Sequence, residues 1–290
     1  MEFLEKPDVW STLLRRTARK GFDASVSLLR SLILQLKTAD SGLGWDEPTW
    51  CLIDRSVEYA LQAENSTGEA QVALLDELDR AAHYRFAKTG RLAAHWSAAM
   101  HSIDQRYRNC PDSFLAYSIT SGLTLYVKAK IGHRVSSINN QMQRPLLQYA
   151  TFYRPVYSQA NAIHPSMVAF LLQAGADPNQ RCMGSTPWRN VLDKLYNRSE
   201  EREKTLESSW IDVCKLFVIY GANPHAYCKR AAENKCFSAL EVIEAAFSHL
   251  PPRPVDELRT MLIQRGAHMW SNAKESGFKR GRTCKLHTPK

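Results

Sequence analysis

The chain has 290 residues, of which 44% are hydrophobic and 23% charged; this is an ordinary composition for a folded protein and excludes disorder throughout the chain. Its formal net charge of +9 raises the question of a nucleic-acid partner. The richest early apolar run, Leu28 to Leu36, contains Arg30 and Gln35 and is far too short to span a membrane. The sequence therefore predicts a soluble, unsecreted protein that is cytoplasmic, with a nuclear location as the alternative.

Residues 1–110 are expected to form an irregular helical domain without repeats. Apolar residues recur at helical spacing in five segments, and each segment predicts one helix. The segments cover residues 10–18, 26–36, 53–61, 72–82 and 92–103. Turn-forming residues at 39–44 separate the second segment from the third, which Pro48 is expected to open.

Residues 111–270 contain three near-copies of one short pattern. The copies are Gly-Ala-Asp-Pro-Asn at 175–179, Gly-Ala-Asn-Pro-His at 221–225 and Gly-Ala-His-Met-Trp at 266–270. Their glycines are 46 and 45 residues apart. Recurrence at a fixed period is typical of solenoids, in which each unit buries its apolar face only against its neighbours. We therefore expect a binding surface in this region rather than a catalytic pocket.

The residues before each glycine predict a helix that ends there. Apolar side chains recur at helical spacing and stop just before the glycine, which takes the left-handed backbone of a helix end without strain. The apolar positions are Met167, Val168, Leu171 and Leu172; Val213, Cys214, Phe217 and Val218; and Leu258, Met261, Leu262 and Ile263.

A further helix is predicted upstream of each of these. Thr186 and Pro187 indicate a helix start, since Thr can cap a helix and Pro suits its first position. Comparable starts occur at Pro145, Ser113 and Ser238. Four helix pairs follow from this pattern, and the first of them, at residues 112–133, is degenerate.

The order of helix start, inner helix, outer helix and Gly-Ala-Asp-x-Asn turn resembles ankyrin repeats, most specifically at Thr186-Pro187 and at residues 175–179. Ankyrin units have roughly 33 residues, and these units exceed that by about a dozen. We assign the excess to loops or helix extensions at residues 154–165, 197–209 and 248–255. The resemblance implies an all-α fold, with the irregular helical domain followed by an ankyrin-like solenoid of about four long, degenerate repeats.

A second resemblance lies in the first helical segments. The stretches Phe-Leu-Glu-Lys-Pro-Asp-Val-Trp at 3–10, Gly-Phe-Asp at 21–23, Ser-Leu-Leu-Arg at 27–30 and Leu-Gln-Leu-Lys at 34–37 are similar to the region that follows the ATPase domain of fungal NACHT-type signalling proteins. In that family a helical domain and ankyrin-like units come next. The resemblance implies a sensing or regulatory C-terminal part of such a protein, with an ATPase domain in cis if the chain belongs to a longer one.

Sequence motifs for catalysis are absent. The 290 residues contain no Gly-x-x-x-x-Gly-Lys-Ser/Thr phosphate loop, no Gly-x-Ser-x-Gly and no His-Glu-x-x-His. The seven cysteines include no Cys-x-x-Cys pair, and an odd number cannot all pair within one chain. We therefore expect no enzyme activity, no cofactor, no metal and no disulfide framework.

Six residues are candidates for contact with a protein partner. They are Asp177, Asn179, Trp188, Asn223, His225 and His268. Five of them follow the repeat glycines, at the hairpin tips that ankyrin proteins often use, and the tryptophan could be an exposed aromatic anchor. Two structural roles compete with partner contact, namely turn chemistry for the Asp, Asn and His residues and packing between units for the tryptophan.

Residues 271–290 are expected to form a basic, flexible tail, with six Lys or Arg against one Glu. A nuclear-targeting or nucleic-acid contact and a partner-docking segment are the alternatives for it, although no nucleic-acid-binding motif accompanies the tail. The sequence as a whole favours a non-enzymatic protein-protein interaction module without a membrane. A nucleic-acid-associated or nuclear protein that uses the basic tail is the runner-up.

Overall fold

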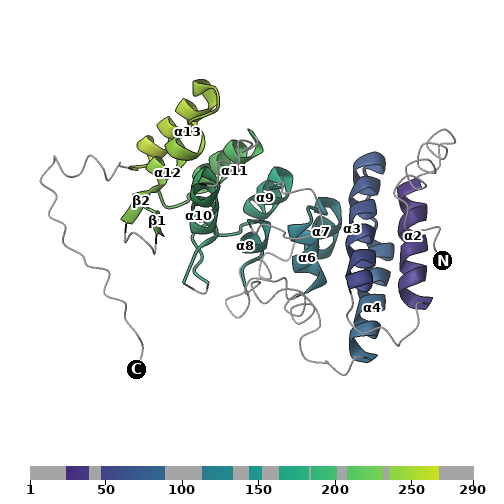
Figure 1. Ribbon diagram of the computed structural model, residues 1–290. Helices are drawn as coiled ribbons and strands as arrows, with labels where there is room; N and C mark the ends of the chain where they lie inside the picture. The colour runs from purple at the N-terminus through teal and green to yellow at the C-terminus, as the bar shows by residue number, and fades with distance from the viewer. Residues whose placement is uncertain are drawn as a thin grey trace, which may run out of the picture. The chain divides into compact units, whose positions relative to one another are not determined.

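A computed structural model describes residues 24–38, 47–88, 113–132, 144–151, 163–182, 184–200, 208–230 and 235–267. These residues are mostly helical, as predicted, with one two-stranded hairpin (Figure 1). The chain divides into two compact units, Met1–Gly184 and Ser185–Lys290. We call them unit 1 and unit 2. The domain bounds at residues 110 and 270 stay predictions.

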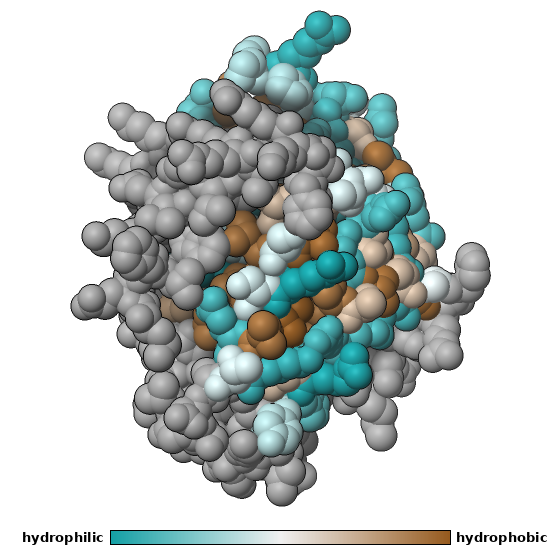
Figure 2. All heavy atoms as spheres, turned by 90° about the vertical axis from the view of Figure 1, so that its right-hand side faces the viewer, coloured by the Kyte–Doolittle hydropathy of each residue, from teal (hydrophilic) through white to brown (hydrophobic). Residues whose placement is uncertain are grey.

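Unit 1 begins with three long helices, α2 (Ala24–Thr38), α3 (Glu47–Thr67) and α4 (Val72–Lys88). α2 packs on α3, and α4 packs on both. The apolar stripes predicted in this region are buried here, which confirms three of the five predicted helices. Figure 2 shows the side of the molecule that carries α2, where apolar side chains gather between hydrophilic ones. Leu34 on α2 is 61% exposed.

Two helix pairs follow within unit 1. The first consists of α6 (Phe114–Thr120) and α7 (Thr124–Ile131), and the second of α8 (Leu146–Ala150) and α9 (Pro165–Gln173). α6 packs on α8 and α7 packs on α9, so the pairs stack first helix on first and second on second. His164 joins the pairs further, because its ring lies against Gly122 in the turn between α6 and α7. Residues 113–132, within the stretch predicted to be a degenerate repeat, therefore form a helix pair that packs against the next pair.

Buried carboxylates connect the long helices to the first pair. Glu64 of α3 accepts the backbone N–H groups of Leu125 at 3.1 Å and Tyr126 at 2.7 Å, at the start of α7. No side chain of α7's own N-cap residue does this, so Glu64 supplies the cap from another helix. Asp54, also on α3, accepts the hydroxyl of Tyr117 at 2.5 Å. The predicted helical domain and the first predicted repeat thus share a polar contact.

Unit 2 contains four helices and the hairpin among its described residues. Its elements are α10 (Pro187–Glu200), α11 (Ser208–Ile219), β1 (Tyr227–Arg230), β2 (Lys235–Ser238), α12 (Ala239–Ala246) and α13 (Pro252–Gln264). α10 packs on α12 and α11 packs on α13, which repeats the stacking seen in unit 1. The hairpin lies between α11 and α12 in sequence and packs against α10.

The helix ends follow the local signals in the sequence. Gly175, Gly221 and Gly266 all have φ near 90°, and in each case the N–H of the next alanine bonds back to the last apolar turn. The three bonds are Ala176 to Leu171, Ala222 to Phe217 and Ala267 to Leu262. At the helix starts, Ser113 and Thr186 accept a backbone N–H, and Ser238 forms a capping box with Glu241. The predicted starts and stops are confirmed.

Two details differ from the expectation of an all-α chain with uniform apolar stripes. The hairpin β1–β2 was not predicted, because its strands have only four residues each. Ile263 was assigned to the buried stripe of α13 but is 49% exposed, since it lies about 100° around the helix from Leu262, which is buried together with Leu258. Among the described residues, no helix is long and apolar enough to cross a membrane.

Candidate functional site

The turns after α9 and α11 are built in the same way. In the first, a carboxylate oxygen of Asp177 accepts the backbone N–H of Asn179 at 2.8 Å, and in the second the amide oxygen of Asn223 accepts the N–H of His225 at 2.9 Å. These are Asx turns, which explain the choice of Asp and Asn at the first of the two positions. The Asp177, Asn223 and His225 side chains are exposed and Asn179 is half-buried. Asp177 and Asn223 therefore close the turns and are also exposed to solvent.

Trp188 holds the second of these turns in place. The residue is fully buried on α10, and its ring stacks on Phe217 of α11 with centroids 5.5 Å apart. Its indole N–H donates to the backbone oxygen of Asn223 at 3.0 Å. Packing accounts for this position, since a buried ring has no free face to offer to a partner.

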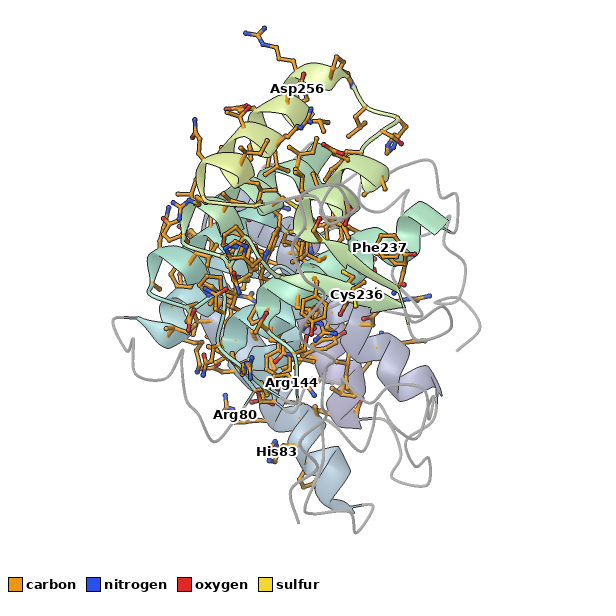
Figure 3. The ribbon with its side chains drawn as sticks, turned by 90° about the vertical axis from the view of Figure 1, so that its left-hand side faces the viewer. Arg80, His83, Arg144, Cys236, Phe237 and Asp256 are labelled. Carbon is orange, nitrogen blue, oxygen red and sulfur yellow. The ribbon has the colours of Figure 1, made fainter. Side chains whose placement is uncertain are left out.

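The hairpin in unit 2 adds residues that the sequence pattern did not single out. Its strands pair in antiparallel register, with Cys228 opposite Phe237, Lys229 opposite Cys236 and Arg230 opposite Lys235. Figure 3 shows Cys236 and Phe237 labelled on β2. Strand-forming residues on both sides of the Ala-Ala-Glu-Asn segment at 231–234 were the available signal for it.

One stripe of α10 lies along the hairpin. Three pairs of side chains meet there: Arg189 with Tyr227, Asp193 with Cys228, and Tyr196 with Phe237. The positions 189, 193 and 196 are spaced by four and three residues, as required for one face of a helix. The guanidinium of Arg189 lies 5.4 Å from the Tyr227 ring centre, and the rings of Tyr196 and Phe237 are 4.9 Å apart. We call these six residues the α10–hairpin surface.

Arg189 and Asp193 form a loose ion pair on this surface, beside the thiol of Cys228. The Nε of Arg189 is buried, makes no hydrogen bond and lies 3.8 Å from a carboxylate oxygen of Asp193. Burial raises the pKa of Asp193, and the hydrogen bond from Cys228 offsets part of that rise. Burial, with the neighbouring Asp193, likewise raises the pKa of the Cys228 thiol well above its usual range. A buried, protonated thiol is a poor nucleophile, so we assign Cys228 a packing role.

Among the described residues, no three His, Cys, Asp or Glu side chains gather where they could hold a metal ion. Two expectations lie outside the described residues, namely His268 and the basic tail at 271–290. The predicted helices at 10–18 and 92–103 lie outside them as well. The nucleic-acid alternative that depends on the tail stays a prediction.

No protein-family model matches this chain, and neither a curated protein nor a solved structure matches it.

Proposed function

We propose that the chain is a non-enzymatic protein-interaction module, built as an ankyrin-like solenoid of four long, degenerate repeats. The observation that carries this proposal is the turn that recurs after α9 and α11. Each copy combines a left-handed glycine, an Asx turn and exposed side chains, at positions 46 residues apart in the sequence. Solenoid proteins bind through similar groups presented by successive repeats, so that several units contact one partner.

The stacking within each unit supports the same proposal. First helices pack on first helices and second on second, both in unit 1 and in unit 2. A repeat protein needs this arrangement, because one helix pair cannot bury its apolar face alone. The contact residues we propose are Asp177, Asn179, Asn223 and His225, with His268 as their counterpart in the last copy. Trp188 has a supporting role, since it anchors the turn at Asn223.

Site-specific photo-crosslinking tests this surface. A photoreactive residue at His225 should capture a protein partner in cells, because this side chain is exposed on the turn. The matched control is the same residue at Arg253, which is exposed on α13 in the same unit. Capture at 225 but not at 253 would support the proposal. Equal capture at both positions, or at neither, would contradict it.

Substitutions that spare the turn sharpen the test. Asn179→Ala and His225→Ala remove side chains but keep the backbone N–H groups that close the Asx turns. We expect the double variant to lose at least about tenfold in affinity for the captured partner, as for two central contact residues. Arg253→Ala, at the exposed control position on α13, should bind nearly as the parent does. Unchanged affinity in the double variant would argue against these turns as the contact surface.

We further propose that the module is the sensing or regulatory part of a NACHT-type signalling protein. This role rests on the resemblance at residues 3–37, of which the structure describes 24–37. The ATPase domain would then lie in cis. An immunoblot with an antibody against residues 113–267 should show a band well above the size of a 290-residue chain. A band at that size would instead indicate a free-standing adaptor.

A further inference from the structure

The last turns of α11 are apolar on their exposed side as well as on their buried side. Ile219 is 55% exposed and Tyr220 is 37% exposed, and Leu216 is half-buried one turn before them. Ile219 and Tyr220 follow Leu216 by three and four residues, so the three side chains share one face of the helix. A surface helix normally has polar residues on the face away from its core. This face of α11 departs from that pattern.

The helices before and after α11 show that the fold does not need apolar side chains at its end. Counted back from the glycine of each turn, Gln173 of α9 and Gln264 of α13 occupy the position of Ile219, and both are exposed. Tyr220 stands where α9 has an alanine and α13 an arginine. The same left-handed glycine follows in all three cases. Helix and turn formation therefore do not account for the exposed isoleucine and tyrosine.

Arg265 adds a positive charge at the same end of α11. Its Nη2 donates to the backbone oxygen of Ile219 at 3.0 Å, which satisfies a carbonyl at the helix end and holds the guanidinium beside the exposed isoleucine. The side chain is exposed, and within the described residues its guanidinium makes no other hydrogen bond and no ion pair. A guanidinium has five N–H donors in a planar fork, so further donors are available to a carboxylate.

We propose that Ile219, Tyr220 and Arg265 bind a segment of the protein partner that carries a large apolar side chain next to a carboxylate. We call these three residues the α11 patch. The isoleucine and the tyrosine contact the apolar side chain, and the arginine pairs with the carboxylate. The turn residue His225 lies at the same end of unit 2, since its ring would be 3.8 Å from a Cβ on Gly266. The inference rests on the proposed function and extends its contact surface from the turn onto α11.

A protein segment fits the α11 patch better than a lipid surface or a nucleic acid does. Anionic membranes and phosphate backbones are bound by several clustered cations. The patch itself contains a single cation, Arg265, and the nearby Lys215 forms an ion pair with Glu257 of α13. Asp212 is exposed on the same face of α11, two turns before Ile219, and its negative charge disfavours a phosphate. One apolar side chain beside one carboxylate matches this distribution.

A peptide selection tests the chemistry of the partner segment. The probe is a phage-displayed library of random linear peptides, screened against the full 290-residue chain. We expect the selected peptides to share a large apolar residue next to an Asp or Glu. The affinity of a synthetic selected peptide should fall as salt is raised, because it includes an exposed charge pair. Selection of peptides without an acidic residue, or no selection at all, would overturn the inference.

Ile219→Gln separates binding from stability. The substitution introduces the residue that α9 and α13 have at this position, so the melting temperature should change by less than about 2 °C. Affinity for the selected peptide should fall at least about tenfold, as for a central contact residue. A loss of affinity at an unchanged melting temperature is not expected of a merely structural residue. Unchanged affinity would overturn the inference.

Substitutions of Arg265 test the charge pair. Arg265→Gln should lower the affinity about tenfold and remove most of its salt dependence, because the remaining contacts are apolar. Arg265→Lys keeps the charge but loses the planar fork, so its affinity should lie between those of the parent and Arg265→Gln. The control is Arg253→Ala, at an exposed arginine about 18 Å away along α13, which should change affinity less than about twofold. Equal losses in Arg265→Gln and Arg253→Ala would overturn the inference.

Two further outcomes separate the alternatives. Binding to vesicles of phosphatidylcholine and phosphatidylserine that is lost in Ile219→Gln, together with an empty peptide selection, would assign the patch to a membrane surface and overturn the inference. If the selection fails while the crosslink at His225 still forms, this inference alone is overturned. If both fail, the proposed function is contradicted as well.

Discussion

Both units have an apolar interior, and unit 1 adds buried polar contacts between distant helices. In unit 1 the long helices meet the first helix pair through buried or half-buried carboxylates. Besides the contacts of Asp54 and Glu64, Asp76 of α4 accepts the hydroxyl of Tyr126 at 2.9 Å and the ammonium of Lys130 at 2.9 Å. Each bond joins residues at least 50 positions apart in the sequence. This interface depends on hydrogen-bond geometry.

In unit 2 the described helices pack through buried apolar side chains, and the ion pairs that link these helices lie at the surface. Trp188 stacks on Phe217 in the interior, and Leu258 and Leu262 of α13 are buried. Surface pairs such as Arg259 with Glu244, at 3.0 Å, link neighbouring helices from outside.

The polar contacts of unit 1 and the apolar packing of unit 2 differ in the substitutions that disrupt them. A buried polar interface fails when one partner is removed, because the other is left without water or a hydrogen bond. An apolar interface fails when a cavity is made, and surface charges matter little to it.

Trp188→Ala should be the most damaging change. Replacing a buried tryptophan leaves a large cavity and typically costs about 3–5 kcal/mol of unfolding free energy. Hydrogen exchange should increase in residues 185–267, including the turn at Asn223, with little change in the long helices of unit 1. Tyr84→Ala, at a side chain that is 60% exposed, is the control and should cost less than about 0.5 kcal/mol. Equal costs for both substitutions would refute the apolar account of unit 2.

Gly122→Ala tests the close packing in unit 1. A Cβ at this glycine would lie 2.5 Å from the His164 ring, and the backbone φ is +80°. Steric overlap and left-handed strain together should cost about 2–4 kcal/mol. Gly221→Ala, with φ +87° but no atom near the added Cβ, should show strain alone, at about 1–2 kcal/mol. Denaturant unfolding measures both, and equal values would rule out the contact with His164 as the cause.

Glu64→Gln tests the polar interface through its pH dependence. Burial raises the pKa of Glu64 above 4.5, against the lowering effect of the two backbone N–H groups. The folded state therefore holds the proton more tightly, and this contribution to stability is complete below pH 4.5 and is lost as the pH rises through the folded-state pKa. The Glu64→Gln variant loses one of the two acceptor oxygens, which should lower the free energy of unfolding by about 1 kcal/mol near pH 4.5. This deficit relative to the parent should shrink as the pH rises.

A matched variant gives the opposite sign. The hydrogen bond from Lys37 lowers the pKa of Glu77, so its contribution to stability is present above pH 4.5 and is lost at lower pH. In denaturant titrations between about pH 4 and pH 7, the stability deficit of Glu64→Gln relative to the parent should therefore shrink as the pH rises, and that of Glu77→Gln should grow. Parallel curves would contradict the assignment of Glu64.

Arg259→Gln should have the smallest effect. The ion pair with Glu244 is largely exposed, so its loss should cost about 0.2–1 kcal/mol, and less at high salt. Urea unfolding at low salt and at 1 M salt, a roughly threefold shorter screening length, would measure the difference. A loss comparable to that of Trp188→Ala would show that unit 2 depends on surface charge.

Much of the local structure could be predicted from the sequence. The helix starts at Ser113, Thr186 and Ser238 and the stops at Gly175, Gly221 and Gly266 depend on caps and backbone conformations within a few residues, so the sequence reveals them. The Asx turns could likewise be anticipated from Asp177 and Asn223. The candidate site could be predicted only in part from the sequence. The contact of Arg189 with Tyr227, for example, forms only because the hairpin packs beside α10.

The sequence by itself determined where helices begin and end and which of their faces are apolar, since capping and 3.6-residue periodicity are short-range properties. The tertiary structure decided that Glu64 caps a helix some 60 residues away, that Trp188 is buried rather than exposed, and that a four-residue strand pair forms against α10. Those outcomes depend on which distant groups meet. No local pattern encodes such contacts, because they follow from the joint burial of surfaces that the folded chain brings together.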